Sequence, residues 1–503
     1  MTQQNGPAEL REAGVLLHPT SLPGPGGQGD LGPSARRFLD GLAGTGFRVW
    51  QVLPVHPVHA DRSPYRPRST FAGHTGLLSA QSLHSQGLLS TSELGTAEDL
   101  PERRALVAAA WDRFRHRHFA GLRARHEQFR HSQAHWLEDY ALFRALADHY
   151  QDHPWTRWPV AIRARSAMAV TRARRRHAGA IERECFGQFL FFEQWQALRA
   201  YAHERDIRLF GDLPLYVDAD SADVWCHREF FTVDAEGQML EVSGVPPDAF
   251  SPTGQLWGHP LYRWDRLAAD GFRWWIERLR AQFDLFDLLR LDHFRGFESF
   301  WAIPGSARNA GDGNWRQGPG RALFDAVRAE LGPLPMVAED LGDITPAVDA
   351  LRRELDLPGM RVLQFGFEGG PDNPHRPDNH TADSVAYTGT HDNDTTLGWW
   401  QSLPPGRRNA VAVALAAATG LERDAVDRAM PRPLVALALT SPARLAVLPV
   451  QDLLGLGSEA RMNVPGTARG NWLWRLDETA VSNLPPDWIT KALRTSGRVA
   501  ENG

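Results

Sequence analysis

Cysteine is nearly absent from this sequence, with only Cys185 and Cys226 among 503 residues. Two cysteines cannot build the disulfide framework of a small secreted domain. No stretch approaches the roughly 18 uninterrupted apolar residues that a membrane span needs, and the N-terminal segment has neither the basic start nor the apolar stretch of a secretory signal. We therefore expect a cytoplasmic protein that does not contact membranes.

Excess positive charge is also missing, because the formal net charge is -5 and the pI is near 6.5. A generic polyanion binder is disfavoured, and no nucleic-acid partner is expected. One basic run is interpreted as a solvated helix face: Arg163, Arg165, Arg172, Arg174, Arg175 and Arg176. Tyrosine is scarce beside tryptophan, 7 against 18, and flat apolar faces with a polar edge suit a sugar-binding cleft as well as a core.

Eight short apolar segments that end in polar residues predict parallel strands: 14–18, 47–54, 207–212, 288–294, 335–340, 359–367, 384–393 and 444–452. A helical segment, 34–42, separates the first two, which is the rhythm of a parallel sheet. Eight such strands predict an α/β fold, a (β/α)8 TIM barrel that spans residues 1–503 as one catalytic unit, with the active site at the carboxyl ends of the strands. A ninth strand-like run, 297–304, is assigned to the loop after the fourth strand.

Two insertions are expected on this barrel. Residues 85–205, between the second and third strands, have helical spacing, notably at 136–150 and 181–205, and predict a helical insertion subdomain. Residues 221–265 form a second insertion whose proline-rich loop, 244–254, is expected to cover the substrate as a lid or wall.

Two opposite charges interrupt the fourth predicted strand. Side chains two apart on a strand share a face, so Arg290 and Asp292 point the same way. A carboxylate withdrawn from water needs a partner, and a cation keeps it ionised. Asp292 is therefore a candidate nucleophile, while the alternative is a purely structural ion pair.

Three carboxylates stand near predicted strand ends: Asp292, Glu339 and Asp392. One ionised carboxylate and one protonated carboxyl are what glycoside chemistry needs. A hydrolytic metal site is the alternative, but Arg290 beside Asp292 would repel a cation, so no metal is expected.

Several segments together resemble the 4-α-glucanotransferases, the amylomaltases or disproportionating enzymes related to the α-amylases: 18–24, 50–54, 63–65, 136–143, 290–296, 337–342 and 458–466. The resemblance runs from about residue 14 to residue 475. It implies a barrel with insertions and without a separate C-terminal β-sandwich.

The resemblance further implies Asp292 as nucleophile, Glu339 as general acid/base and Asp392 as stabiliser of the oxocarbenium-like transition state. It implies that Tyr65, Asp212, Arg290, His293 and His391 hold the transferred glucosyl unit, and that Gln255, Trp257 and Asn463 line the path of the glucan. No cofactor is implied. The expected partners are α-1,4-glucans, namely maltodextrins, amylose and glucose as acceptor, and a monomer is favoured. An α-glucan hydrolase or a non-catalytic glucan-binding protein are the alternatives.

The sequence leaves the family pattern at residues 56–62. Amylomaltases commonly carry Gly-Pro-Thr-Gly-Tyr-Gly-Asp here, whereas Ala60 stands where an aromatic residue is usual. We expect weaker secondary binding of long glucans as a result. His56, His59 and Asp61 have metal-ligand chemistry, but the loop is interpreted as a solvated rim.

Overall fold

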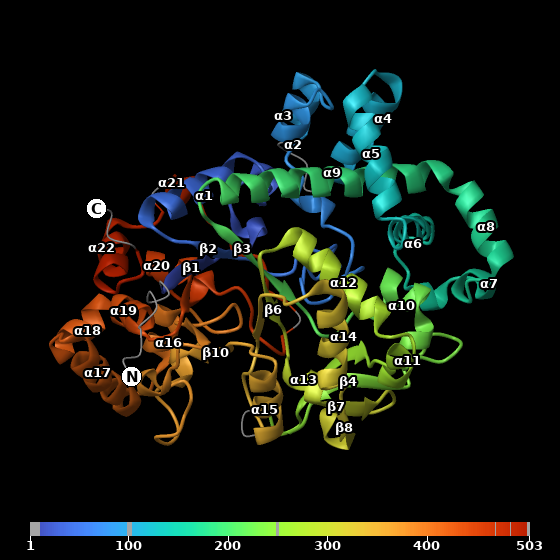
Figure 1. Cartoon of the computed structure of the whole chain (residues 1–503). Coiled ribbons are helices and arrows are strands. Elements are labelled where there is room, and N and C mark those ends of the chain that lie inside the picture. The colour runs from blue at the N-terminus through green and yellow to red at the C-terminus, as the bar shows by residue number, and fades with distance from the viewer. Residues whose placement is uncertain (1–10, 98–102, 248–250, 468, 483, 500–503) are drawn as a thin grey trace, which may run out of the picture.

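Eight parallel strands form the centre of the computed structural model (Figure 1), which describes residues 11–97, 103–247, 251–467, 469–482 and 484–499. They are β1 (Glu12–Leu16), β2 (Val49–Gln51), β3 (Arg208–Leu213), β6 (Leu288–Leu291), β9 (Met336–Ala338), β10 (Gly359–Val362), β11 (Ser384–Tyr387) and β12 (Leu445–Pro449). Their order in the sheet is β10-β11-β12-β1-β2-β3-β6-β9. All eight predicted strands are confirmed, although several end earlier than the sequence pattern indicated.

The sheet curls into a nearly closed barrel. β1 pairs with both β2 and β12, so the beginning and end of the chain meet in the sheet. β9 and β10 stand at the two ends of the ladder and are bridged by the Ala338 N–H, which donates to the Pro358 carbonyl at 2.9 Å. This pair of strands is the seam of the barrel.

Close packing between barrel strands depends on small residues. A Cβ at Gly14 in β1 would lie 2.8 Å from the Val49 Cβ in β2, which is shorter than normal van der Waals contact. The first barrel helix, α1 (Pro33–Thr45), begins with proline and ends at Gly46, whose φ of 103° favours glycine. This confirms the helix predicted at 34–42.

The other helices that follow barrel strands surround the sheet (Figure 1). They are α12 (Arg273–Leu285), α14 (Arg321–Leu331), α15 (Pro346–Glu354), α16 (Thr396–Ser402), α17 (Pro405–Thr419), α18 (Arg423–Ala429), α19 (Arg432–Thr440), α20 (Val450–Leu454), α21 (Glu478–Ser482) and α22 (Asp487–Thr495).

Helices fill the connection between β2 and β3. They are α2 (Ala80–Ser85), α3 (Thr91–Ala97), α4 (Arg104–His116), α5 (Ala120–Ser132), α6 (Leu137–His149), α7 (Val160–Arg163), α8 (Ala167–Arg176) and α9 (Ala178–His203). The helices predicted at 136–150 and 181–205 are thus confirmed as α6 and α9. Several of the others project away from the barrel (Figure 1).

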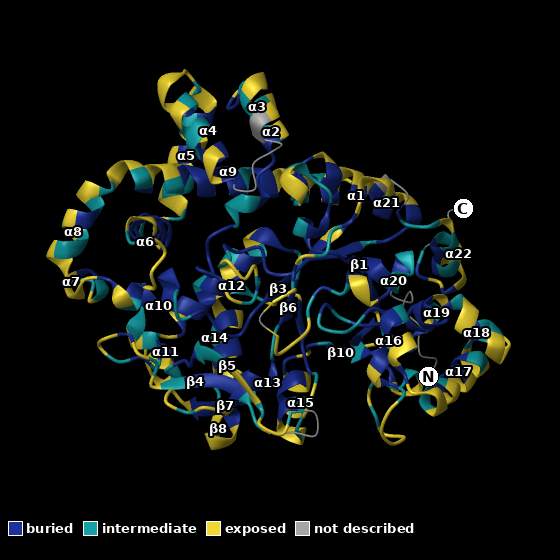
Figure 2. Cartoon of the chain, turned by 180° about the vertical axis from the view of Figure 1, so that it is seen from behind, coloured by how far each residue is buried: buried dark blue, intermediate teal, exposed yellow. Residues whose placement is uncertain are grey.

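The basic run lies on α7 and α8 and in the turn between them. Arg172, Arg175 and Arg176 are exposed, as Figure 2 shows for much of α8. Arg165 and Arg174 are half-buried and form ion pairs with Asp139 on α6 at 2.9 and 2.8 Å, so these two also hold the segment against α6.

A second sheet is antiparallel and has the order β5-β4-β7-β8. Its strands are β4 (Glu241–Val245), β5 (Gln255–Pro260), β7 (Ser299–Pro304) and β8 (Asn314–Gln317), with α10 (Ala222–Cys226), α11 (Trp264–Ala269) and α13 (Arg295–Glu298) nearby in the chain. The run at 297–304 supplies β7, so its assignment outside the barrel is confirmed. The loop predicted at 244–254 starts two residues later than expected, because Gly244 and Val245 belong to β4; residues 246–254 join β4 to β5, and 248–250 lie outside the described residues.

None of the helices in the described ranges is long and apolar enough to cross a membrane.

Candidate active site

Arg290 and Asp292 meet at the carboxyl end of β6. Arg290 Nη1 lies 2.9 Å from Asp292 Oδ1, so the predicted ion pair is confirmed, although β6 ends at Leu291 and Asp292 stands in the turn that follows. The guanidinium is almost fully buried, whereas 26% of the Asp292 side chain is exposed. A partly open carboxylate fixed by a buried cation is suited to attack a substrate from one direction.

Arg290 also binds a second carboxylate on the neighbouring strand. Its Nη1 donates to both oxygens of Asp212, at 2.8 and 2.9 Å, and the Asp212 side chain is fully buried. Tyr65 donates its hydroxyl to the same carboxylate at 2.6 Å. Burial raises the pKa of Tyr65 well above its usual value, so the phenol stays protonated and remains a donor.

Glu339 lies immediately after β9 on the other side of Arg290. Its Oε2 is 3.9 Å from Arg290 Nη2 and accepts the backbone N–H of His293 at 2.8 Å, while Oε1 accepts that of Leu341 at 2.9 Å. Burial raises the pKa of Glu339 to about 7; the Arg290 guanidinium opposes the rise and the Asp292 carboxylate adds to it. A carboxyl with this pKa can give and take a proton near neutral pH.

The backbone of His293 is strained where it contacts Glu339. His293 has φ of 48°, in the left-handed region that costs a non-glycine residue about 1–2 kcal/mol. This conformation accompanies the N–H donation to Glu339 Oε2. Burial also lowers the pKa of the imidazole to about 4, so the ring is neutral near pH 7.

Asp392 lies in the loop after β11 rather than directly at the strand end, which is Tyr387. Its Oδ1 accepts the Asn463 side-chain amide at 2.6 Å and lies 3.4 Å from His391 Nε2. Arg461 donates to the Asp392 carbonyl at 2.7 Å. These contacts hold a carboxylate whose side chain is 46% exposed.

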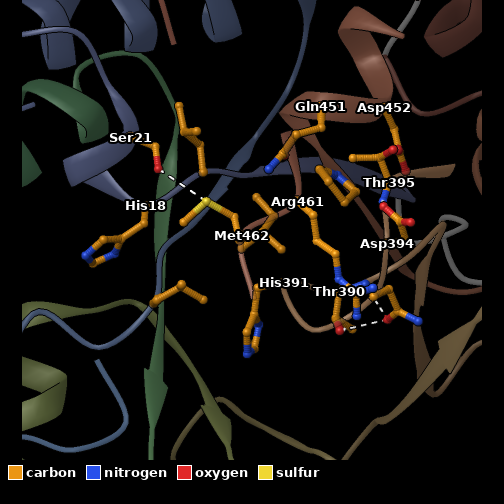
Figure 3. Close-up of a pocket in the computed structure, with 15 residues that line it drawn as sticks. His18, Ser21, Thr390, His391, Asp394, Thr395, Gln451, Asp452, Arg461 and Met462 are labelled. Atoms are coloured by element: carbon orange, nitrogen blue, oxygen red, sulfur yellow. Dashed lines mark hydrogen bonds between the residues drawn. The ribbon is translucent and has the colours of Figure 1, made fainter. Parts of the chain in front are cut away.

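Aromatic rings connect the Asp392 group to the Arg290 group. The Tyr65 ring stacks on His391 with centroids 5.1 Å apart, and Trp472 lies 6.0 Å from both rings. A pocket beside His391 is lined by residues of the loops after β1, β11 and β12, including His18 and Met462 (Figure 3).

The second sheet reaches the site through Trp257 on β5. The Trp257 ring meets the His293 ring edge to face at 4.7 Å, and its indole N–H donates to Gln255 Oε1 at 3.1 Å. Gln255 itself is exposed. The structure therefore links all the sequence-predicted site residues by successive contacts, from Gln255 at one end to Asn463 at the other.

Two further residues belong to this network and were missed by the sequence reasoning. Trp472 packs against Tyr65 and His391, and Arg461 binds the loop that carries Asp392. Arg461 stands inside the segment 458–466 that carries the family resemblance, which was an available signal; Trp472 follows that segment.

The rim interpretation of 56–62 is wrong for His56. His56 is buried, bonding the Ala72 carbonyl at 2.8 Å and Gln282 at 3.2 Å. His59 lies 3.5 Å from Asp218, while Ala60 and Asp61 are exposed. Within the described ranges no three His, Cys, Asp or Glu side chains gather as a metal site would require.

Comparison with known proteins places this geometry in a family. A family model described as 4-alpha-glucanotransferase matches residues 17–480. The 4-alpha-glucanotransferase of Thermus thermophilus is 47% identical and covers 93% of this chain and 95% of its own length. The chloroplastic/amyloplastic 4-alpha-glucanotransferase of Solanum tuberosum is 42% identical, with coverages of 98% and 87%.

A solved structure agrees in fold. The amylomaltase from Streptococcus agalactiae, determined in complex with acarbose, superposes with a TM-score of 0.91 at 32% identity and covers 97% of this chain and all of its own. The amylomaltase from Corynebacterium glutamicum, at 20% identity and a TM-score of 0.78, shares the fold.

Proposed function

This chain belongs to the 4-alpha-glucanotransferase family and acts on α-glucans, and we propose that it does so by a retaining double displacement centred on Asp292 and Glu339. The observation that carries the proposal is their contrasting environment around Arg290. Asp292 is paired at 2.9 Å with the guanidinium, whereas burial raises the pKa of Glu339 to about 7. This contrast supplies an anionic nucleophile beside a carboxyl that can hold a proton.

In the first step, an Asp292 oxygen attacks the anomeric carbon of the donor glucan. The bond from that carbon to the glycosidic oxygen breaks, and the Glu339 carboxyl transfers its proton to the departing 4-oxygen. The product is a glycosyl ester on Asp292 and an ionised Glu339. Arg290 orients both carboxylates throughout.

In the second step, the 4-hydroxyl of another glucan or of glucose enters the acceptor position. Ionised Glu339 takes its proton, the new oxygen bonds to the anomeric carbon, and the ester to Asp292 breaks. Each step inverts the anomeric centre, so the α-configuration is retained. Maltodextrins are disproportionated in this way, and cyclic glucans form when the acceptor is the far end of the same chain.

The remaining site residues hold the sugar. We assign Asp392 to stabilise the positive charge of the transition state, because its carboxylate is positioned by Asn463 and His391 and open to substrate. We assign Tyr65, Asp212, Arg290, His293 and His391 to the transferred glucosyl unit, and Gln255, Trp257 and Asn463 to the glucan path. The Tyr65–His391 stack supplies an apolar face of the kind that sugar rings use.

Whether water or sugar completes the second step decides between transferase and hydrolase. We propose that the loop 244–254 walls the acceptor side, because the β4–β5 hairpin it joins reaches His293 through Trp257. A wall that excludes water protects the glycosyl enzyme from hydrolysis.

We further propose that residues 1–503 work as one catalytic unit, with 85–205 and 221–265 as insertions, and that the enzyme is a cytoplasmic monomer using maltodextrins and amylose as donors and glucose among its acceptors. Size-exclusion chromatography with light scattering tests the oligomeric state. Cell fractionation tests the location.

Incubation of the purified protein with maltotriose tests the function. Longer maltodextrins together with glucose mean transfer, glucose and maltose alone mean hydrolysis, and unchanged maltotriose means binding without catalysis. Trapping with a glycosyl fluoride tests the roles: Asp292→Asn should form no covalent sugar adduct, whereas Glu339→Gln should still load from the fluoride. Mass spectrometry that placed the sugar on Glu339 would reverse the assignment.

A further inference from the structure

The proposed acid/base, Glu339, lies beside the seam between β9 and β10, the two strands that the sheet ladder does not join. Glu339 directly follows β9, and β9 and β10 are the strands that end the ladder. Ala338 bonds Pro358 across this seam, before β10 begins at Gly359. Glu339 is held on the β6 side, where its N–H donates to the Leu291 carbonyl at 3.0 Å and its carbonyl accepts the Phe294 N–H at 3.2 Å. The side that faces β10 is where a further contact can fix the position of this strand end.

The next residue, Asp340, crosses the seam with its side chain. Its Oδ1 accepts the backbone N–H of Met360 on β10 at 2.6 Å, where a ladder bond would otherwise stand. Its Oδ2 accepts Arg361 Nη1 at 3.1 Å and lies 3.5 Å from Arg352 Nε on α15. Asp340 is 8% exposed, so these charge-assisted bonds are shielded from water.

The space for this carboxylate exists because β10 begins with glycine. A Cβ on Gly359 would lie 2.2 Å from Asp340 Oδ2, which no real contact permits. Position 359 must therefore be glycine for the Asp340 carboxylate to occupy this place.

The two neighbours of Asp340 in the chain are the proposed acid/base and one of the residues that hydrogen-bond it. Glu339 precedes it, and Leu341, which follows it, donates its N–H to Glu339 Oε1 at 2.9 Å. A displacement of Asp340 moves both the carboxyl and one of its two backbone donors. The Arg290 and His293 contacts come from β6 and the loop after it, and do not fix β9 relative to β10.

We propose that Asp340 is a positioning residue that closes the barrel seam and thereby aims Glu339 at the glycosidic oxygen. The inference rests on the proposed role of Glu339 as general acid. Asp340 is not itself a catalytic residue, because its side chain contacts strand β10 and not the substrate.

The test compares two donors with different needs for acid catalysis. Maltotriose needs a proton on its leaving oxygen, whereas maltotriosyl fluoride does not. Asp340→Ala should lower kcat/KM for maltotriose by roughly 10- to 100-fold, the scale of a small misplacement of a reacting group, and leave glycosylation by the fluoride within about threefold. Asp340→Asn should lose less, because its amide oxygen still accepts the Met360 N–H.

Three variants distinguish the positioning role from a general folding defect. Gly359→Ala should produce the same selective loss with Asp340 intact, and adding Asp340→Ala to it should cost little more, because the clash is then gone. Asp349→Asn is the matched control, since it removes the charge of the outer partner of Arg352, which lies at 2.9 Å, and leaves the Asp340 contacts in place.

Glu339→Gln is measured first on both donors. If it shows no preference for the fluoride, the proposed function itself is wrong. If it shows the preference but Asp340→Ala slows both donors equally, or the double variant is strictly additive, the positioning role is refuted and the proposed function stands.

Discussion

Arg290 in β6 and Asp292, which directly follows that strand, are joined at 2.9 Å between Nη1 and Oδ1. The same Arg290 nitrogen contacts both oxygens of Asp212, and Nη2 lies 3.9 Å from Glu339. One planar cation therefore sets the relative positions of three carboxylates.

Arg290→Lys should lower kcat/KM for maltotriose about 100-fold, because a single ammonium cannot bridge three carboxylates. Leaving buried Asp212 poorly paired should also lower the free energy of unfolding by about 3–5 kcal/mol. Steady-state kinetics and denaturant unfolding measure the two effects. Arg321→Lys, at an exposed pair with Asp325, is the control and should change neither. Wild-type kinetics in Arg290→Lys would mean that the ion pair is structural only.

The kcat/KM for maltotriose should fall on the basic side of about pH 7. The pKa of Glu339 is raised from 4.5 to about 7, so the protonated form is present below that value and is lost as the pH rises through it. kcat/KM reports the free enzyme and the first step, which needs the proton. The rate of glycosylation by maltotriosyl fluoride should lack this limb. A limb shared by both donors would show that another group titrates.

Ala60→Tyr should strengthen binding of long amylose several-fold, since an aromatic face contributes about 0.5–1.5 kcal/mol. Ala60 is exposed on the turn beyond buried His56, so a new ring there would reach solvent rather than the core. Affinity electrophoresis in amylose measures the binding, and Ala60→Ser is the control. An equally large change in maltotriose turnover would place the turn in the catalytic cleft.

Shortening the loop 244–254 should increase the fraction of glycosyl enzyme that is hydrolysed, because water then reaches the ester on Asp292. The rise in total reducing ends, relative to the maltodextrins longer than maltotriose that form, measures this fraction, because transfer conserves the number of reducing ends and each hydrolysis adds one. An equal shortening at the exposed residues 420–422, between α17 and α18, is the control. An unchanged ratio would argue against a wall at the acceptor side.

The sequence by itself determined the strands and the local pairing. Each barrel strand is a short apolar run, and the two-residue period of a strand already places Arg290 and Asp292 on one face. The strand ends were less well determined: Asp392 falls beyond β11 because the polar residues that follow Tyr387 form a loop stabilised by Asn463 and Arg461. Those partners are distant in the chain.

Only the tertiary structure decided which side chains are buried and which strands need help to pair. His56 looked like part of a polar surface loop, but Gln282, 226 positions away, lies beside it in the core. Asp340 was only the last residue of the predicted strand 335–340, and the role proposed for it depends on Met360 and Arg361 across the seam. Burial and electrostatics depend on contacts between distant segments, and a local pattern of residue types does not contain them.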